Sequence, residues 1–464
     1  MNSNTLNDFR HEIYRCFGKA KDALFNLVDT LASEAGARSF PELSLSPLFE
    51  RTWASLYEAL EDGQIDVERL REICVQFAPL PEKGQVVFFG IDTSNLYRPE
   101  AETATDRTLV KMANLPAKTH VASPGWVIIS VVLLPRQASQ GTFVLDTVRV
   151  RSTEQATEVA VRQLRAVVAL LVTRGLHPII LGDRWYACAP LLARMTDVDA
   201  RCAVRVSKAI ASFTARPQSG SPDKREPGAS DGERFQCSDE RTHGQPDETW
   251  EGTDDKGAKV EVRCWNHLHL RTARWVELSL IQVIRHGASG SKRDPRISWF
   301  VWKGNQSAPL AEIRPIYRLR YSHEHGYRFD KQELLWDAPR FSTPERTECW
   351  TQLVACAHNL LVLARPLVEG CYRPWENRRS ELTLTQVRRA MPSLLCQLGT
   401  PARPSKPRWI CTRTDQRLSS QASNSLSGHL QNERQAEKEQ KGSLCLRFLV
   451  GFFSSSLVFL RSEP

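Results

Sequence analysis

Four polar residues between positions 317 and 331 have types and spacing that could act together on a phosphate-containing partner. Arg320, Glu324 and Lys331 lie three, seven and fourteen residues after Tyr317. At roughly 100° per residue these positions fall within one stripe about 60° wide on a helix. This stripe predicts a polar site presented to a partner, with Glu324 as a metal ligand. The basic residues are candidate contacts to a phosphate backbone, and Tyr317 could hydrogen-bond or stack beside it.

Two aspartates that follow short apolar runs could complete a metal site with Glu324. Asp92 follows Gln85–Ile91 and Asp183 follows Pro178–Leu181, and both runs are typical of buried strands. A carboxylate there is costly to bury unless it is paired or binds a metal, although many aspartates at strand ends are only structural. Three carboxylates suit two Mg²⁺ (or Mn²⁺) ions about 4 Å apart. One ion would activate a water or a 3′-hydroxyl, and the other would stabilise the leaving 3′-oxygen of a phosphodiester.

The elements that must position these residues follow a regular order. Apolar runs predict five strands, the first three in an antiparallel meander, at 85–91, 126–134, 142–150, 178–181 and 201–206. Helices are expected at 153–174 and from near Tyr186. This order predicts a ribonuclease-H-like α/β fold, a mixed sheet with flanking helices. The first and fourth strands are neighbours in such a sheet, so Asp92 and Asp183 can share one metal site.

The rest of the chain divides by composition. The expected parts are a helical N-terminal domain at 1–80, two parts of the catalytic domain at 81–207 and 304–400, a loop-rich and β insertion at 208–303, and a disordered tail with an apolar end at 401–464. Further helices are expected at 6–32, 46–60, 66–77, from near Pro315, 345–367 and 383–398, further strands at 258–265, 275–284 and 297–301, and an irregular loop at 95–120. The N-terminal helices could read DNA ends, or could serve only for packing or protein contact.

Length, net charge and cysteine content narrow the class of protein. The chain has 464 residues, a formal charge of +9 and a pI near 9.0, which suits nucleic acid but also fits a merely basic soluble protein. Twelve cysteines without a CxxC pair argue against a zinc ribbon or a disulfide framework and favour a cytoplasmic location. No signal peptide or membrane span is expected, since Leu444–Leu460 is short and interrupted.

Histidine pairs offer a competing metal site. His323 and His325 flank Glu324, but side chains two residues apart on a helix diverge, so zinc binding there is disfavoured. His267 and His269 would share one face of a strand, which we expect to be solvated. A glycine-rich phosphate loop, a GxSxG motif and a kinase signature are absent from the sequence.

The spacing of Tyr317, Arg320, Glu324 and Lys331 matches, at all four positions, the Y-(2)-R-(3)-E-(6)-K signature of bacterial insertion-sequence DDE transposases. With Asp92 in GIDTSN and Asp183 in GDRWYA, the chain resembles these enzymes over about residues 5–405. The resemblance implies Mg²⁺-dependent cut-and-paste transposition of DNA, a synaptic complex that is expected to hold a homodimer, and association with the bacterial nucleoid. It also implies a mainly β insertion between the second Asp and the Glu, which here are about 140 residues apart.

Some relatives use a tryptophan of this insertion to receive a flipped base. Trp250, Trp265 and Trp275 are candidates, although core packing is the expected role of the last two. The chain departs from the family after Thr400–Arg408, where a basic tail gives way to a Ser- and Gln-rich one. Two other functions stay open: a catalytically inactive DNA-binding relic or repressor, and a ribonuclease-H-like nuclease without strand transfer.

Overall fold

The computed structural model describes the chain as far as Ser405 with several gaps. The described residues are 2–112, 121–136, 141–207, 233–270, 273–287, 295–304, 307–378 and 381–405, together with the backbone of 212–215. Residues 1–404 form one compact unit. The expected disordered tail and its apolar end lie outside the described residues from position 406 onward, as does most of 208–232.

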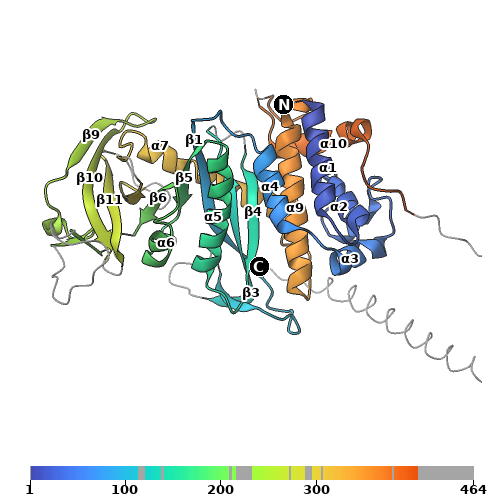
Figure 1. Ribbon diagram of the computed structural model, residues 1–464. Coiled ribbons are helices and arrows are strands. Elements are labelled where there is room, and N and C mark those ends of the chain that lie inside the picture. Colours follow the sequence, from blue (N-terminus) through green and yellow to red (C-terminus); the bar gives the residue numbers. More distant parts are fainter. Residues whose placement is uncertain are drawn as a thin grey trace, which may run out of the picture. The chain divides into compact units, whose positions relative to one another are not determined.

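The core of the fold is the mixed sheet that the strand order predicts (Figure 1). Its strands are β1 (Val86–Tyr97), β3 (Ala122–Leu133), β4 (Phe143–Val150), β5 (His177–Gly182) and β6 (Arg201–Val206). β1, β3 and β4 form the antiparallel meander, while β5 pairs in parallel with β1 on one side and with β6 on the other. The ribonuclease-H-like α/β prediction is therefore confirmed.

The expected irregular loop at 95–120 was wrong in part. β1 continues through its polar residues to Tyr97, and Thr108–Lys111 forms β2, which pairs with the first residues of β3. The continuation is stable because Ser94 and Leu96 are buried while their backbone pairs with β3. The sequence prediction therefore ended this strand too early, because it counted only the apolar residues.

Two long helices cover the meander. α5 (Ala156–Thr173) packs on β3, β4 and β5, and α9 (Pro344–Ala364) packs on β4. The Asn359 side chain of α9 accepts from the Val144 N–H at 2.7 Å and donates to the Val144 carbonyl at 2.8 Å. These bonds satisfy backbone groups on β4 where its pairing with β3 is irregular. A shorter helix, α6 (Ala189–Arg194), lies between β5 and β6 in sequence.

The N-terminal helices are α1 (Ser3–Cys16), α2 (Lys21–Ser33), α3 (Trp53–Asp62) and α4 (Val67–Phe77), with the 3₁₀ turn η1 (Pro41–Leu45) between α2 and α3. The single helix expected at 6–32 is broken, because Ala20 has a positive φ of 58°. Asp66 caps α4 as expected, since its side chain accepts from the Arg69 N–H at 3.0 Å.

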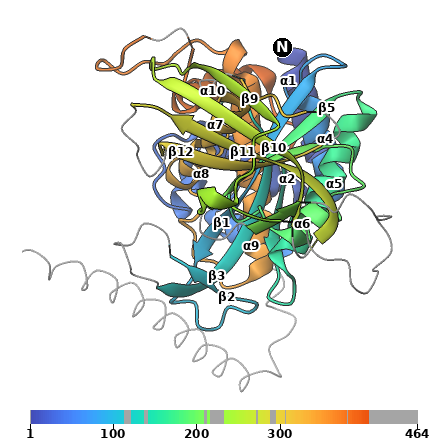
Figure 2. The ribbon, with the colours of Figure 1, turned by 90° about the vertical axis from the view of Figure 1, so that its left-hand side faces the viewer.

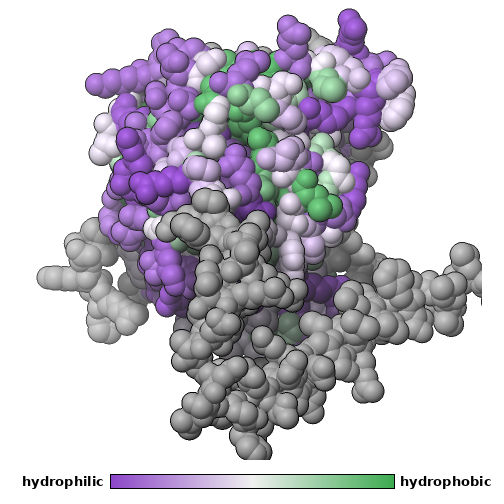
Figure 3. All heavy atoms as spheres, turned by 90° about the vertical axis from the view of Figure 1, so that its right-hand side faces the viewer, coloured by the Kyte–Doolittle hydropathy of each residue, from purple (hydrophilic) through white to green (hydrophobic). Residues whose placement is uncertain are grey.

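These helices share a core with the C-terminal part of the unit. α2 packs on α9 and on α10 (Leu384–Leu398), and the buried Arg388 of α10 donates to the Leu31 carbonyl at 2.8 Å. Figure 3 shows this side of the molecule, where hydrophobic side chains reach the surface among hydrophilic ones. The exposed large hydrophobic side chains of the N-terminal helices include Leu45 of η1 and Trp53 and Tyr57 of α3.

The insertion extends the central sheet (Figures 1 and 2). Its strands are β7 (Ser212–Ala215), β8 (Arg234–Gln236), β9 (Glu248–Thr253), β10 (Lys259–Leu270), β11 (Ala273–Arg285) and β12 (Ile297–Lys303), with the 3₁₀ turn η3 (Glu240–Thr242) after β8. β12 pairs antiparallel with β6, so the described strands form one twelve-stranded sheet. The mainly β insertion is as expected, but β7, β8 and β9 lie in a segment expected to be loop.

Two expectations for the insertion's side chains were wrong. A register shift in β10, with His267 at a φ of 55°, exposes His267 and buries His269, so the two do not share a face. Trp275 is 56 % exposed and does not pack in the core. Trp265 is buried and stacks on Trp299, as expected for a packing residue.

Candidate active site

Asp92 lies at the point where β1 loses its parallel partner. Ile91 pairs with Gly182, the last residue of β5, while Asp92 itself still pairs with Ser130 of β3. The prediction that Asp92 ends a strand was wrong, because the strand continues on its antiparallel side. Asp92 nevertheless keeps the position expected for a site residue, since it lies beyond the end of β5 rather than between two paired strands.

Asp183 is the first residue after β5, as predicted. Its side chain accepts from the Trp185 N–H at 2.9 Å, which fixes the turn that leaves the strand. Burial, and then the charge of Asp92, raise the pKa of Asp183. Burial likewise raises the pKa of Asp92, against the lowering effect of the Arg320 charge. The two aspartates are therefore close enough to repel each other, and a cation nearby would stabilise both.

The helix that carries Glu324 is in two segments. α7 (Ile313–Arg318) and α8 (Tyr321–Gln332) are separated by Leu319 and Arg320. Both residues keep right-handed helical dihedrals, and i→i−3 hydrogen bonds of the 3₁₀ type join the two segments through Arg320. The prediction of one stripe presented to a partner was wrong in part, because Tyr317 is buried while Glu324 is exposed. From this turn the Arg320 Nη1 donates to Asp92 Oδ2 and its Nη2 donates to Glu324 Oε1, both at 2.9 Å.

The other two residues of the stripe are less available than the sequence suggested. Tyr317 is 8 % exposed and packs against Phe300 with ring centroids 4.8 Å apart. Burial raises the pKa of Tyr317 to about 12, although the neighbouring Arg320 charge lowers it. Lys331 is partly buried; its Nζ donates to the Asn95 carbonyl at 3.3 Å and lies over the Trp336 ring. Tyr317 is thus not presented at the surface.

The carboxylates suit a metal in their chemistry, but they are not assembled around one. Oxygen ligands are those that Mg²⁺ prefers, and two of the three carboxylates are largely buried. Across the described ranges, however, no three His, Cys, Asp or Glu side chains are close enough together to hold a metal ion. Arg320 supplies the positive charge between Asp92 and Glu324 instead. The metal-binding role of Asp92, Asp183 and Glu324 stays a prediction.

α8 is held on the sheet by contacts that the sequence did not reveal. The Tyr327 hydroxyl donates to the Asp92 carbonyl at 2.9 Å. Gly326 lies so close to the start of β4 that an added Cβ would come 2.6 Å from Thr142 Oγ1. On the other side of the site, the buried Tyr186 shares a 2.8 Å hydroxyl contact with Thr93. Neither tyrosine lies in the Tyr317–Lys331 stripe pattern, so spacing alone could not identify them.

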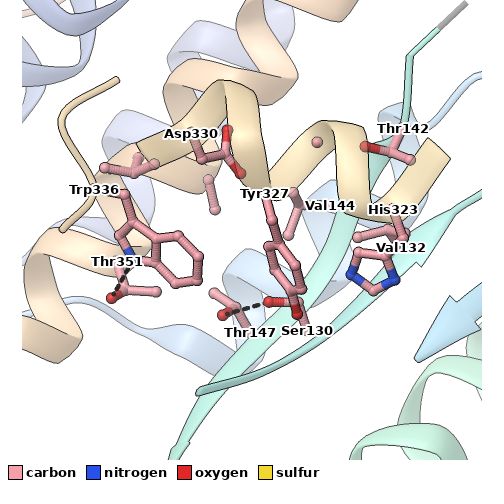
Figure 4. Close-up of a pocket in the computed structure, with 13 residues that line it drawn as sticks. Ser130, Val132, Thr142, Val144, Thr147, His323, Tyr327, Asp330, Trp336 and Thr351 are labelled. Carbon is pink, nitrogen blue, oxygen red and sulfur yellow. Dashed lines mark hydrogen bonds between the residues drawn. The ribbon is translucent and has the colours of Figure 1, made fainter. Parts of the chain in front are cut away.

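A small cavity of about 20 Å³, whose lining surface is mostly apolar, lies under α8 (Figure 4). His323, Tyr327 and Asp330 of α8 line it together with Ser130 and Thr142 from the sheet and its edge. His323 is buried, and among the described residues neither of its ring nitrogens has a hydrogen-bond partner. Burial, and then the Arg320 charge, lower the pKa of His323 to about 3, so this ring is neutral.

His323 and His325 diverge as expected, since the first is buried under α8 and the second is exposed. The expectation that this pair does not bind zinc stays a prediction. The candidate functional groups of this region are the carboxylates and Arg320.

Comparison with known families bears on this site. A family model described as DDE superfamily endonuclease matches residues 12–271. This segment begins within α1, ends just after β10 and includes Asp92 and Asp183. The chain belongs to the DDE superfamily endonucleases. The matched segment ends before Glu324, so the superfamily match does not bear on the third carboxylate. A search of curated proteins finds no match to the chain.

Membership of this endonuclease superfamily agrees with the mixed sheet and with the two aspartates at neighbouring strands. It indicates a nuclease or transposase role that acts on DNA, and such endonucleases typically use divalent metals. Among the described residues of this DDE endonuclease, no helix is long and apolar enough to cross a membrane.

Proposed function

We propose that this DDE endonuclease is the transposase of an insertion sequence, which cuts the ends of the element and joins them to target DNA. The observation that carries the proposal is that Asp92 lies near enough to Asp183 for its charge to raise the pKa of Asp183, while Arg320 bridges Asp92 to Glu324. Superfamily membership supports the endonuclease part. The Tyr-Arg-Glu-Lys spacing supports the transposase part, because a nuclease without strand transfer has no need of it.

In this proposal Asp92, Asp183 and Glu324 hold two Mg²⁺ or Mn²⁺ ions. Bound there, the ions supply Lewis acidity and an activated water or 3′-hydroxyl for in-line displacement at a phosphodiester. The chain's own residues position the reaction. Tyr327 holds the backbone of Asp92 through its hydroxyl. Arg320 and Lys331 are the candidate contacts to DNA phosphates.

Tyr317 has a different place in the proposal from the one that its spacing suggested. Because it is buried beside Arg320, we assign it to holding the guanidinium rather than to contacting DNA directly. The N-terminal helices remain candidates for recognition of the element ends. Their packing on α9 and α10 would tie any such recognition to the catalytic sheet.

Linear DNA carrying the element ends, incubated with the purified full chain and Mg²⁺ or Mn²⁺, tests the function. Cleavage followed by joining to a target plasmid supports a transposase. Cleavage without joining would support a nuclease, and binding without cleavage would support a repressor. Two copies on paired ends, seen by light scattering of the complex, would support the expected homodimer.

Site-directed variants test the residues. We expect Asp92→Asn, Asp183→Asn and Glu324→Gln each to slow cleavage by more than the roughly 10–100-fold that loss of a partner behind a ligand costs. Glu312→Gln is the matched control, because Glu312 is an exposed glutamate at the start of the neighbouring α7 and its side chain makes no cap. Unchanged cleavage in Glu324→Gln, with the control also unchanged, would remove Glu324 from the mechanism.

A further inference from the structure

We propose that Arg320 is an exchangeable counter-ion of the carboxylate site, which pairs with Asp92 and Glu324 in the metal-free protein and moves to a DNA phosphate once a divalent cation takes those carboxylates. This inference rests on the proposed function for the identity of the DNA partner. Its metal-binding half concerns this chain alone and can be tested without DNA. Arg320 would then be a positioning residue that makes metal binding and DNA binding favour each other.

The first observation is the way the guanidinium divides its donors. It does not form a forked pair with one carboxylate; Nη1 bonds to Asp92 on β1 and Nη2 bonds to Glu324 on α8. The Arg320 side chain is 14 % exposed, Asp92 16 % and Glu324 43 %, so the bridge runs from the largely buried Asp92 to the exposed Glu324. A guanidinium in this place bonds the same carboxylate oxygens that a metal would use.

The second observation is the charge balance. Asp92, Asp183 and Glu324 provide three carboxylates, against the guanidinium of Arg320 and the charge of the exposed Arg184, which also acts on Asp183. The site therefore keeps a negative excess when all groups are ionised. Two divalent cations would turn this into a positive excess, and an anion such as a phosphate would relieve it. Exchange of Arg320 onto DNA therefore follows from charge as well as from shared ligands.

The third observation is the local backbone. Arg320 lies in the short turn with 3₁₀-type hydrogen bonds that joins α7 to α8. A long side chain there can change its direction by rotamer changes alone, without displacing either helix. Meanwhile α8 stays fixed to the sheet by Tyr327 and Gly326. The mobile partner in the exchange is thus the side chain, and Glu324 stays in place.

A static salt bridge makes the opposite prediction about metal affinity. If Arg320 only braces Glu324 against Asp92, its removal should disorganise the carboxylates and weaken metal binding. If Arg320 competes with the metal, its removal should strengthen metal binding, by about ten- to a hundredfold for the loss of two charge-assisted contacts. The sign of the change separates the two roles.

The test uses the full-length protein without DNA. Mn²⁺ titrations followed by electron paramagnetic resonance would give dissociation constants for wild type, Arg320→Ala, Arg320→Gln and Arg318→Ala. Arg318 is the matched control, because it is an arginine two residues away that pairs with Asp255. We expect tighter Mn²⁺ binding in both Arg320 variants and little change in the control. Equal or weaker binding in both would overturn the proposal.

Two further measurements serve as controls. Thermal melts in EDTA show whether each variant is folded. If Arg320→Ala is unfolded, Arg320→Gln, which keeps some hydrogen bonding, replaces it in the comparison. DNA affinity is then measured with and without Ca²⁺, expected to bind without cleavage. In wild type the cation should tighten DNA binding, and DNA should tighten cation binding by the same factor. In Arg320→Ala this coupling should be lost, and retained coupling would overturn the exchange.

The outcome is distinguishable from failure of the proposed function. Tighter Mn²⁺ binding in the Arg320 variants, with lost coupling to DNA, supports the exchange even if wild type never joins ends to a target. Conversely, a wild type that cuts and joins DNA while its Arg320 variants bind Mn²⁺ more weakly keeps the transposase and refutes the exchange.

Discussion

The buried pair of His358 and Asp330 should control how firmly the Glu324 helix is held. His358 of α9 lies 2.6 Å from Asp330 of α8 through Nδ1, and 2.9 Å from the Thr142 carbonyl through Nε2. When Asp330 is ionised both partners are acceptors, so both ring nitrogens donate and the ring is positively charged below its raised pKa. The pair therefore links α8, α9 and the start of β4 at one point, six residues along α8 from Glu324.

The cost of breaking this pair follows from its burial. The His358 side chain is 1 % exposed and that of Asp330 is 10 % exposed, so His358→Leu leaves a carboxylate with little access to water. Removal of one partner from a buried pair typically costs about 3–5 kcal/mol. Asp330→Asn should cost less, because a neutral His358 can still donate to Thr142 and accept from the amide. The double variant His358→Leu/Asp330→Asn should be more stable than His358→Leu alone, because it leaves no unpaired carboxylate.

The same pair gives a pH dependence with a definite sign. Burial alone would lower the pKa of His358, but Asp330 and the Thr142 carbonyl together raise it above the ordinary 6.5. A raised pKa in the folded state contributes stability that is fully present below about pH 6.5 and is lost as the pH rises through the folded value. The stability advantage of wild type over His358→Leu should therefore shrink as the solution becomes alkaline.

Urea unfolding of the full chain at about pH 6 and about pH 8.5 would measure these differences. His325→Leu is the matched control, since His325 is an exposed histidine of α8, the helix that carries Asp330, and should change stability little. A cost below about 1 kcal/mol for His358→Leu at pH 6, or an advantage of wild type that grows with pH, would refute the charged-pair reasoning. A double variant no better than His358→Leu would refute the unpaired-carboxylate explanation.

Three smaller predictions follow from neighbouring contacts. Tyr327→Phe removes the hydroxyl that donates to the Asp92 carbonyl, and should lower the free energy of unfolding in urea by about 1 kcal/mol. An unchanged free energy of unfolding would mean that this hydrogen bond does not stabilise the fold. Gly326→Ala should cost about 1–3 kcal/mol because the new Cβ meets Thr142 Oγ1 at 2.6 Å, and adding Thr142→Ala should restore stability if that clash is the cause. Burial alone would raise the pKa of Asp254, but the N–H groups of Ala258 and Lys256 and the Arg285 guanidinium lower it to about 2. The stability that ionised Asp254 contributes to the fold is therefore complete above about pH 3.8 and is lost as the pH falls through about 2. The difference in acid unfolding between wild type and Asp254→Ala should close over that range, and a constant difference would contradict it.

The strands of the central sheet could be predicted because each is a short, dense apolar run. Arg201–Val206 was predicted at the bounds that β6 has, and β4, β5 and β12 were predicted within a few residues. Such runs are buried on both faces, so composition alone identifies them. The continuation of β1 past Asp92 was missed because its residues are polar, and only the pairing with β3, which is distant in sequence, makes them a strand.

The site was predicted less completely than the sheet. Asp183 follows its strand as expected, because a turn-forming aspartate after an apolar run is a local feature. Tyr327 and His358 could not be identified from sequence, since their partners are Asp92 and Asp330 on other elements and no local pattern marks them. Tyr317 was assigned to the surface because helical spacing gives a face but does not say which face is buried.

The break between α7 and α8 explains why spacing and geometry disagree. A continuous helix would keep Arg320 and Glu324 on one stripe beside Tyr317, and all three would face the same partner. The 3₁₀-type turn through Leu319 and Arg320 instead lets α7 bury Tyr317 in the core while α8 keeps Glu324 at the surface, with Arg320 between them. From that turn the guanidinium reaches Asp92 on the sheet and Glu324 on α8 at the same time. Helical spacing places a residue on a face, but only the packing of that face decides whether the residue meets the core, a neighbouring carboxylate or a partner.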